Sequence, residues 1–154
     1  MMKLEAIEIG VGIGPLRFGM TREEVNSLLG EADEVEYIEA TTEDEESSII
    51  WHYDELEVSL SFADEPDWML VAIATSSEDV QLAGKKVIGS NKESVLKLVA
   101  EFGLGDADEE DITDEDGIPT TVVYLYESAM NLWFENNELT EIQWGAIWDE
   151  ESLN

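Results

Sequence analysis

Apolar residues recur at helical spacing in two short segments of the chain. Val25, Leu28 and Leu29 stand at positions i, i+3 and i+4, the spacing that places side chains on one face of a helix. Thr21 precedes this stripe as a capping residue, and Gly30 follows it as a terminating glycine. The pattern predicts a helix over 21–29.

A second stripe of the same kind occurs in the other half of the chain. Val95, Leu98 and Val99 repeat the spacing, and Asn91 stands where an N-cap is expected. We therefore predict a second helix over 91–102.

Apolar runs broken by turn residues predict antiparallel strands in both halves. The segments 51–62 and 123–134 each have the pattern of strand, tight turn and strand. The segments 68–75 and 139–148 each add one further strand. In each half, a meander of strands is thus expected to follow a helix.

The two halves match when the chain is aligned with itself at an offset of 70 residues. Identical residues coincide at Gly14 and Gly84, Gly19 and Gly89, Glu23 and Glu93, Val25 and Val95, and Leu28 and Leu98. We predict an α+β protein, a tandem repeat of helix plus antiparallel β-meander, with one continuous antiparallel sheet and helices on one face. The predicted units are 1–78 and 79–154, which share one core because a single unit has few apolar residues.

Two acidic segments, 36–48 and 106–117, interrupt these patterns, and we expect them to be solvated loops. An EF-hand loop that begins at Asp106 fails at its sixth position, Asp111, and at its twelfth, Gly117. No metal site is therefore expected. Weak binding of divalent cations by the acidic loops of a stand-alone bacterial domain is the alternative function.

The charge of the chain narrows the choice of partner. The sequence has 38 Asp and Glu residues against 7 Lys and Arg, which gives a formal net charge of −31. Such a charge repels nucleic acid and anionic lipid and favours encounter with a basic protein. The same charge is also typical of highly soluble proteins and of proteins adapted to high salt. We expect a basic protein partner, no nucleic acid and no membrane; the oligomeric state stays open.

The chain has no cysteine, which excludes disulfides, thiolate metal sites and cysteine nucleophiles. The segment 1–14 has an alternating pattern with glutamates in place of an unbroken apolar run, so it does not resemble a secretory signal. We expect a cytoplasmic protein, unless a leader has already been removed.

Motifs for catalysis or cofactor binding are missing from the sequence. The glycines of 10–19 lack the Lys and Ser/Thr of a phosphate-binding loop, and Pro15 stands where a dinucleotide fingerprint needs its third glycine. His52, the only histidine, is close in sequence to acidic residues, an arrangement that also occurs at general bases and metal ligands. A histidine at the surface or at an interface is the simpler interpretation. A carboxylate hydrolase stays an open alternative. We predict a protein with no cofactor that is not an enzyme.

The segment 18–34, FGMTREEVNSLLGEADE, resembles the helix signature G-M-T-x-x-E-V-x-x-L-L-G-x-P-D of bacterial SmpA/OmlA-like domains. It is also similar to the related fold of the β-lactamase inhibitor protein, in which a helical segment and a sheet occur in tandem. Ala32 replaces the proline of the signature, and the lipidation cysteine of the outer-membrane members is missing. What the resemblance implies is binding of other proteins through the sheet, without enzymatic activity.

Aromatic residues on the predicted strands and turns are the candidate partner-binding residues, because aromatic side chains anchor protein interfaces. They are Trp51, Tyr53, Trp68, Tyr124, Tyr126, Trp133, Trp144 and Trp148. Trp133 lies between Leu132 and Phe134 and is therefore expected to point away from the face that those two residues bury. We predict a non-catalytic acidic protein-binding module. An inhibitor or immunity protein for a basic toxin or enzyme is one protein of this kind.

Overall fold

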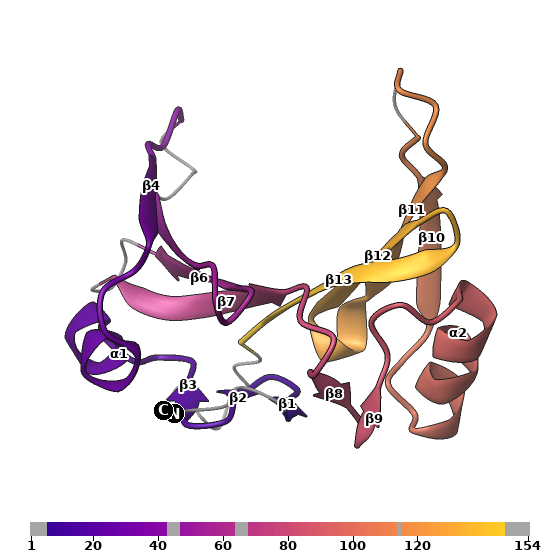
Figure 1. The fold of residues 1–154 in the computed structure, drawn as a ribbon, viewed down its shortest axis with the longest axis horizontal. Helices are drawn as coiled ribbons and strands as arrows, with labels where there is room; N and C mark the ends of the chain where they lie inside the picture. Colours follow the sequence, from indigo (N-terminus) through magenta and orange to yellow (C-terminus); the bar gives the residue numbers. More distant parts are fainter. Residues whose placement is uncertain (1–5, 43–46, 64–67, 114, 147–154) are drawn as a thin grey trace.

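The structure is a computed structural model that describes residues 6–42, 47–63, 68–113 and 115–146. Its main element is an antiparallel sheet of eight strands (Figure 1). These strands are β4 (Glu34–Ile38), β5 (Ser48–Tyr53), β6 (Val58–Ala63), β7 (Met69–Thr75), β10 (Ala107–Asp111), β11 (Thr120–Leu125), β12 (Met130–Glu135) and β13 (Glu138–Gly145). Their order across the sheet is β10-β11-β12-β13-β7-β6-β5-β4, so β7 and β13 join the two halves at the centre.

Smaller elements form a second layer against one face of this sheet (Figure 1). They are β1 (Ile7–Glu8), β2 (Gly12–Ile13), β3 (Leu16–Arg17), α1 (Arg22–Leu29), β8 (Gln81–Leu82), β9 (Lys85–Lys86) and α2 (Lys92–Glu101), and a 3₁₀ turn, η1 (Tyr126–Ser128), follows β11. The strands β1, β2 and β3 pair with one another, and β8 pairs with β9.

Local sequence explains where the two helices begin. The Thr21 side chain accepts a hydrogen bond from the backbone of Glu24, whose own side chain accepts from the backbone of Thr21, which completes a capping box. The Asn91 side chain accepts from the backbone of Ser94 at the start of α2. The two helices predicted from the sequence are present, and each begins directly after its predicted cap.

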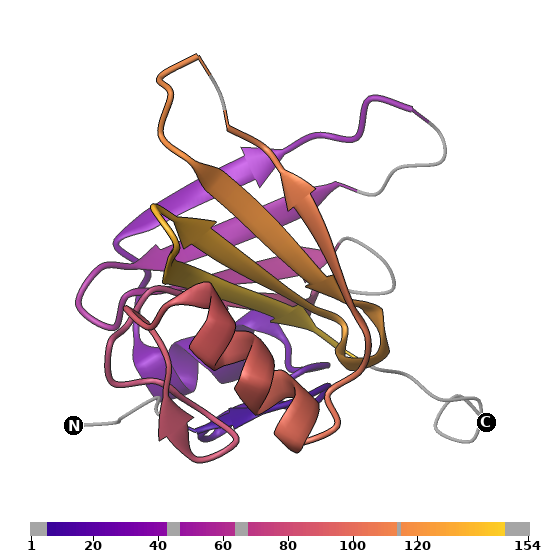
Figure 2. The same cartoon turned by 90° about the vertical axis from the view of Figure 1, so that its right-hand side faces the viewer.

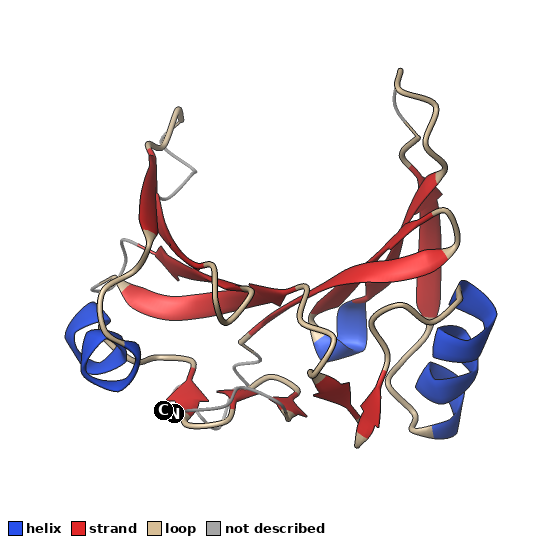
Figure 3. Ribbon diagram, in the orientation of Figure 1, coloured by secondary structure: helices blue, strands red, loops and turns tan. Residues whose placement is uncertain are grey.

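The predicted α+β fold is nevertheless wrong, because the described residues are mostly β, with 46% in strands, 16% in helices and only two α-helices (Figure 3). Eight strands span about 34 Å at about 4.8 Å between neighbours. Two helices of about 10 Å diameter cannot cover that width. The short strands β1, β2, β3, β8 and β9 fill the space between the helices, so the second layer is not helical (Figure 3).

The description of the fold as tandem units of one helix and one meander is also wrong, because each half contains short strands in addition to these elements. Short strands precede each helix: β1 to β3 come before α1, and β8 and β9 come before α2. The division of the chain at residues 78 and 79 stays a prediction. Buried residues from both predicted units, including Val25 and Val95, belong to one core cluster between the sheet and the second layer.

Contrary to the prediction, the acidic segments are not entirely loops, because parts of them form the two edge strands. Glu34–Ile38 is β4 and Ala107–Asp111 is β10, and both pair along five residues with the next strand. In the connections that follow these strands, the described residues 39–42 and 115–119 project beyond the sheet on the same side (Figure 2). We call the described parts of these two connections the acidic arms.

The sheet is bent so that its two edges rise on the side away from the helices (Figure 1). Its register shifts in β6 between Ser61 and Phe62 and in β12 between Trp133 and Phe134. Such bulges bend the strand and increase its twist. The bend leaves a concave face between β4 and β10.

Candidate protein-binding face

One row of directly paired residues crosses all eight strands. Its members are Glu34, His52, Ser59, Ala74, Gln143, Asn131, Tyr124 and Asp108, from β4 to β10. Directly opposed residues of antiparallel strands point to the same face of a sheet. The residues in alternation with this row, such as Leu60, Ile73 and Leu132, are fully buried in the core on the other face. The row therefore lies on the concave face.

Along β6 and β7 the floor of the concave face carries small side chains, and its walls carry carboxylates. Ser61 pairs with Ala72 on the neighbouring strand, beside Ser59 and Ala74. At one wall, Glu34 and Glu36 of β4 are exposed; at the other, Asp108 and Glu110 of β10 are exposed. Small floor residues leave room above the sheet, and the walls give that room a negative potential.

Hydrogen bonds between strands hold several of these side chains in place. The His52 Nδ1 atom lies 2.7 Å from Ser59 Oγ, and its Nε2 atom lies 3.2 Å from Glu36 Oε1. Tyr124 donates its hydroxyl proton to Glu110 Oε2 over 2.9 Å, and this bond raises the pKa of Tyr124. These contacts link β4 to β5 at one wall of the concave face and β10 to β11 at the other.

A pocket of about 300 Å³ opens at one end of the concave face, near the turn between β5 and β6. Its walls carry four carboxylates, those of Glu34, Asp54, Glu57 and Glu141, together with His52 and hydroxyl groups. We call it the acidic pocket. Burial raises the pKa of Glu141, and the charge of Glu135 raises it further. A cation that entered the acidic pocket would relieve this unfavourable environment.

Trp133 leaves a hydrogen-bond donor unused on the same face. The side chain pairs across the strands with Val122 and Glu141, while Leu132 and Phe134 are buried on the other face, as predicted. Its Nε1 atom is buried and has no acceptor among the described residues. A buried donor without an acceptor costs about 1–3 kcal/mol.

The other predicted aromatic residues lie in different surroundings. Tyr124 and Tyr126 stack with their ring centroids 6.0 Å apart, and Tyr126 is 71% exposed. Trp68 is half-buried and lies below the Arg22 guanidinium, 5.4 Å from it, beside Tyr37.

Three of the predicted aromatic residues point into the core side of the sheet. Trp144 is 1% exposed and donates to the carbonyl of Gly12 over 3.3 Å. Tyr53 is also buried and donates to the carbonyl of Gly30, and burial, followed by the charge of Asp33, raises its pKa to about 12. Trp51 packs on Phe62, with a centroid distance of 4.9 Å. Trp148 lies outside the described residues.

The carboxylates and small residues of the concave face were not singled out from the sequence, where the aromatic rings gave the stronger signal. A signal was present in β13, where Glu141 and Gln143 alternate with the apolar Ile142 and Trp144. Such alternation is typical of a strand with one polar face. It does not indicate which other strands contribute to that face.

Two other kinds of site have no candidate within the described residues. That part of the chain contains no group of three or more His, Cys, Asp or Glu side chains placed to hold a metal ion. None of its helices has the length and apolar character needed to cross a membrane.

Comparison with known proteins extends the description of the fold. No family model matches the chain, and no curated protein matches it. An extracellular protein from Bacillus anthracis strain Ames that contains an SCP domain, solved at 1.5 Å, is similar in structure with a TM-score of 0.51. The match has 17% sequence identity and covers 88% of this chain but 45% of that one. It shows a shared fold, and this chain corresponds to less than half of that protein.

Proposed function

We propose that this chain is a non-catalytic module that binds a basic protein on the concave face. The observation that carries the proposal is the combination of a floor of small side chains with two acidic walls and the acidic pocket. A basic surface that entered the concave face would have its charges opposite carboxylates on both sides. Complementary charges of this kind raise the rate of association and select the partner.

The acidic pocket is suited to one Lys or Arg side chain of such a partner. Burial raises the pKa of Glu141, so an opposing cation beside this carboxylate would be favourable. The rings of Tyr124 and Tyr126 extend the contact area near β10.

The proposal includes the role of an inhibitor or immunity protein for a basic toxin or enzyme. The resemblance of 18–34 to SmpA/OmlA-like domains and to the β-lactamase inhibitor protein agrees with binding through the sheet, and it stays a prediction. The net charge of −31 supports a basic partner.

The test is capture of partners from a lysate of the source organism by three baits, with identification by mass spectrometry. The baits are the unchanged chain, Glu34→Gln/Glu36→Gln on the concave face, and Glu23→Gln/Glu93→Gln on the helices. The two variants have equal net charge, so only the position of the lost charges differs. We expect a basic protein that is retained by the unchanged chain and the helix variant and is at least about tenfold depleted on the concave-face variant, since each charged contact is worth about 1.5–3 kcal/mol.

Equal retention by both variants would show attraction by net charge without a defined face and would contradict the proposal. The absence of any retained protein would contradict it as well, provided that circular dichroism confirms that the baits are folded.

A further inference from the structure

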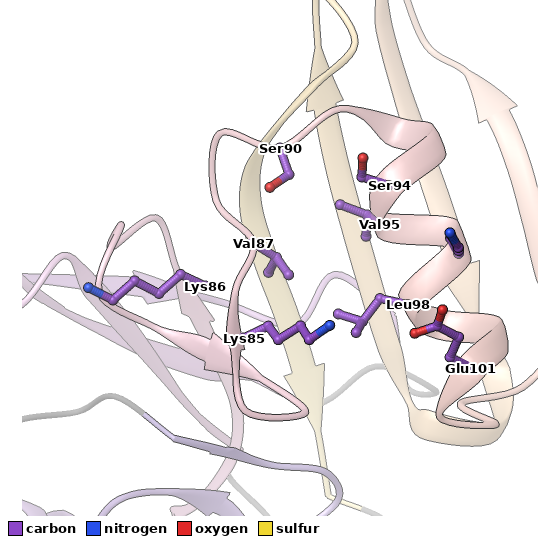
Figure 4. Close-up of a pocket in the computed structure, with 9 residues that line it drawn as sticks. Lys85, Lys86, Val87, Ser90, Ser94, Val95, Leu98 and Glu101 are labelled. Atoms are coloured by element: carbon purple, nitrogen blue, oxygen red, sulfur yellow. The ribbon is translucent and has the colours of Figure 1, made fainter.

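Basic residues are concentrated at one place in this acidic chain. Four of the seven Lys and Arg residues, Lys85, Lys86, Lys92 and Lys97, lie between positions 85 and 97. Three of these four, all except Lys92, line a pocket of about 270 Å³ between α2 and the segment that precedes it (Figure 4). We call it the basic pocket. It belongs to the second layer, on the opposite side of the sheet from the concave face (Figure 1).

Two lysines of the basic pocket have no ionic partner within the described residues. Lys86 lies 3.6 Å from Asp79, and Lys92, outside the pocket, lies 2.6 Å from Glu109. For Lys85 and Lys97, by contrast, no carboxylate oxygen of that part of the chain lies within ion-pair distance. Both lysines are exposed, so their ammonium groups are solvated in the free chain and are available to an anion that enters the basic pocket.

The directions of the side chains support a site with a charged entrance. Figure 4 shows the Lys85 side chain directed toward α2, where Leu98 and Glu101 lie, whereas Lys86 is directed away. Ser90 and Ser94 also line the pocket, and their hydroxyl groups make no hydrogen bond within the described residues. The ammonium groups of Lys85 and Lys97 are donors that a carboxylate head group accepts from, whereas the Glu101 carboxylate lies on the α2 side of the same pocket.

The floor of the basic pocket is aliphatic. Val87, Val95 and Leu98 line it and are between 1% and 5% exposed as whole residues. A small hydrophilic anion such as phosphate would make no apolar contact with this floor. An anion with a short aliphatic tail would cover it, and each buried methylene contributes about 0.8 kcal/mol.

From this arrangement we infer that the basic pocket binds a small amphiphilic carboxylate, with its head group between Lys85 and Lys97 and its aliphatic tail on Val87, Val95 and Leu98. The ligand is small for two reasons. The pocket has about 270 Å³, which is at the lower end of ligand sites. In addition, a large acidic partner would be repelled by the net charge of −31, whereas a single charge is repelled little beyond the screening length of about 8 Å. The inference does not depend on the function of the concave face.

Titration of the full chain with hexanoate, followed by ¹H–¹⁵N NMR spectra, tests the inference. We expect saturable shifts confined to the amides of 85–101. Hexan-1-ol, which lacks the charge, and inorganic phosphate, which lacks the tail, should each bind at least about tenfold more weakly.

Variants of single lysines locate the site. Lys85→Gln and Lys97→Gln should each weaken hexanoate binding about tenfold, because a charge-assisted hydrogen bond is lost. Lys92→Gln serves as the matched control, since Lys92 is on the same helix as Lys97 but pairs with Glu109, and it should bind as the unchanged chain does. The same spectra report whether each variant is folded.

The inference is overturned if hexanoate causes no saturable shifts at 85–101. It is equally overturned if phosphate or hexan-1-ol binds as well as hexanoate, or if Lys85→Gln and Lys97→Gln bind like Lys92→Gln.

Discussion

Glu141 is a residue whose ionised form lowers the stability of the folded chain. It lines the acidic pocket, and burial together with the charge of Glu135 raises its pKa. The folded chain therefore binds the Glu141 proton more tightly than the unfolded chain does. Stability from this group is complete below the unfolded pKa and is lost as the pH rises through the folded pKa. At neutral pH, the folded chain holds a carboxylate where a neutral group would be more favourable.

Replacement of Glu141 by Gln should therefore raise the free energy of unfolding at pH 7. The gain over the unchanged chain should shrink as the pH falls toward about 4, because the carboxyl group becomes protonated first in the folded chain and then increasingly in the unfolded chain. Urea unfolding of both chains between about pH 4 and pH 8 measures the difference. A variant that is less stable at pH 7, or a difference that does not depend on pH, would show that Glu141 is well accommodated. Residues that lower stability in this way are typical of functional sites.

The short strand β2 illustrates how a small element depends on one glycine. Gly12 has a φ of 154°, and a Cβ atom at this position would lie 2.0 Å from the carbonyl oxygen of Leu16 on β3. The backbone at Gly12 is held in place, because its carbonyl accepts the hydrogen bond of the buried Trp144 and β2 is the middle strand of its sheet. There is no room to relieve the clash.

We expect Gly12→Ala to be more destabilising than Gly84→Ala, the control at another glycine of positive φ. Gly84 has a φ of 81°, and a methyl group added there would have nothing within 4 Å, so its replacement should cost about 1–2 kcal/mol from backbone strain alone. Gly12→Ala should cost about 1–3 kcal/mol more, because overpacking is added. Urea unfolding of the two variants gives the comparison. Equal costs would mean that β2 can move away from β3.

Elements with strong local signals could be predicted from the sequence, and those without could not. The caps Thr21 and Asn91 and the apolar stripes that follow them determined both helices, as observed. The edge strand β10 escaped prediction because the residues of 107–111, Ala-Asp-Glu-Glu-Asp, have low strand propensity and no apolar alternation. The edge strand β4, Glu-Val-Glu-Tyr-Ile, does alternate, but its glutamates placed part of it in a predicted acidic loop. Pairing with a long neighbouring strand decides their structure, and that contact is not local.

At the scale of the whole molecule, the concave face could not be predicted because no one segment contains it. Its row of residues takes one position from each of eight strands, and the order β13-β7 at the centre brings the halves together. The aromatic residues suggested a surface, but Trp144 and Tyr53 are needed in the core. Burial of a ring depends on which face of the sheet the second layer covers.

The net charge of the molecule predicts how its stability responds to salt. Among the described residues there are few ion pairs, such as those of Lys86 and Lys92, for salt to weaken, whereas a net charge of −31 produces strong self-repulsion. A rise in NaCl from about 0.1 M to about 1 M shortens the screening length from about 10 Å to about 3 Å. The urea midpoint should therefore increase with NaCl.

Choline chloride at equal ionic strength is the control for this measurement. Similar gains in both salts would indicate general screening, and a midpoint that falls with NaCl would contradict the prediction. A gain that only NaCl produces would instead indicate specific retention of sodium ions by the carboxylates.

The acidic edge strands have a further consequence for the behaviour of the protein at high concentration. β4 and β10 each leave one row of backbone N–H and C=O groups unpaired, which is a template for the addition of a strand from another copy. Glu34 and Glu36 on one edge and the run of 107–111 on the other would place like charges side by side in any such stack. Because that repulsion opposes edge-to-edge growth, the same carboxylates that line the walls also act as gatekeepers against fibrillar aggregation.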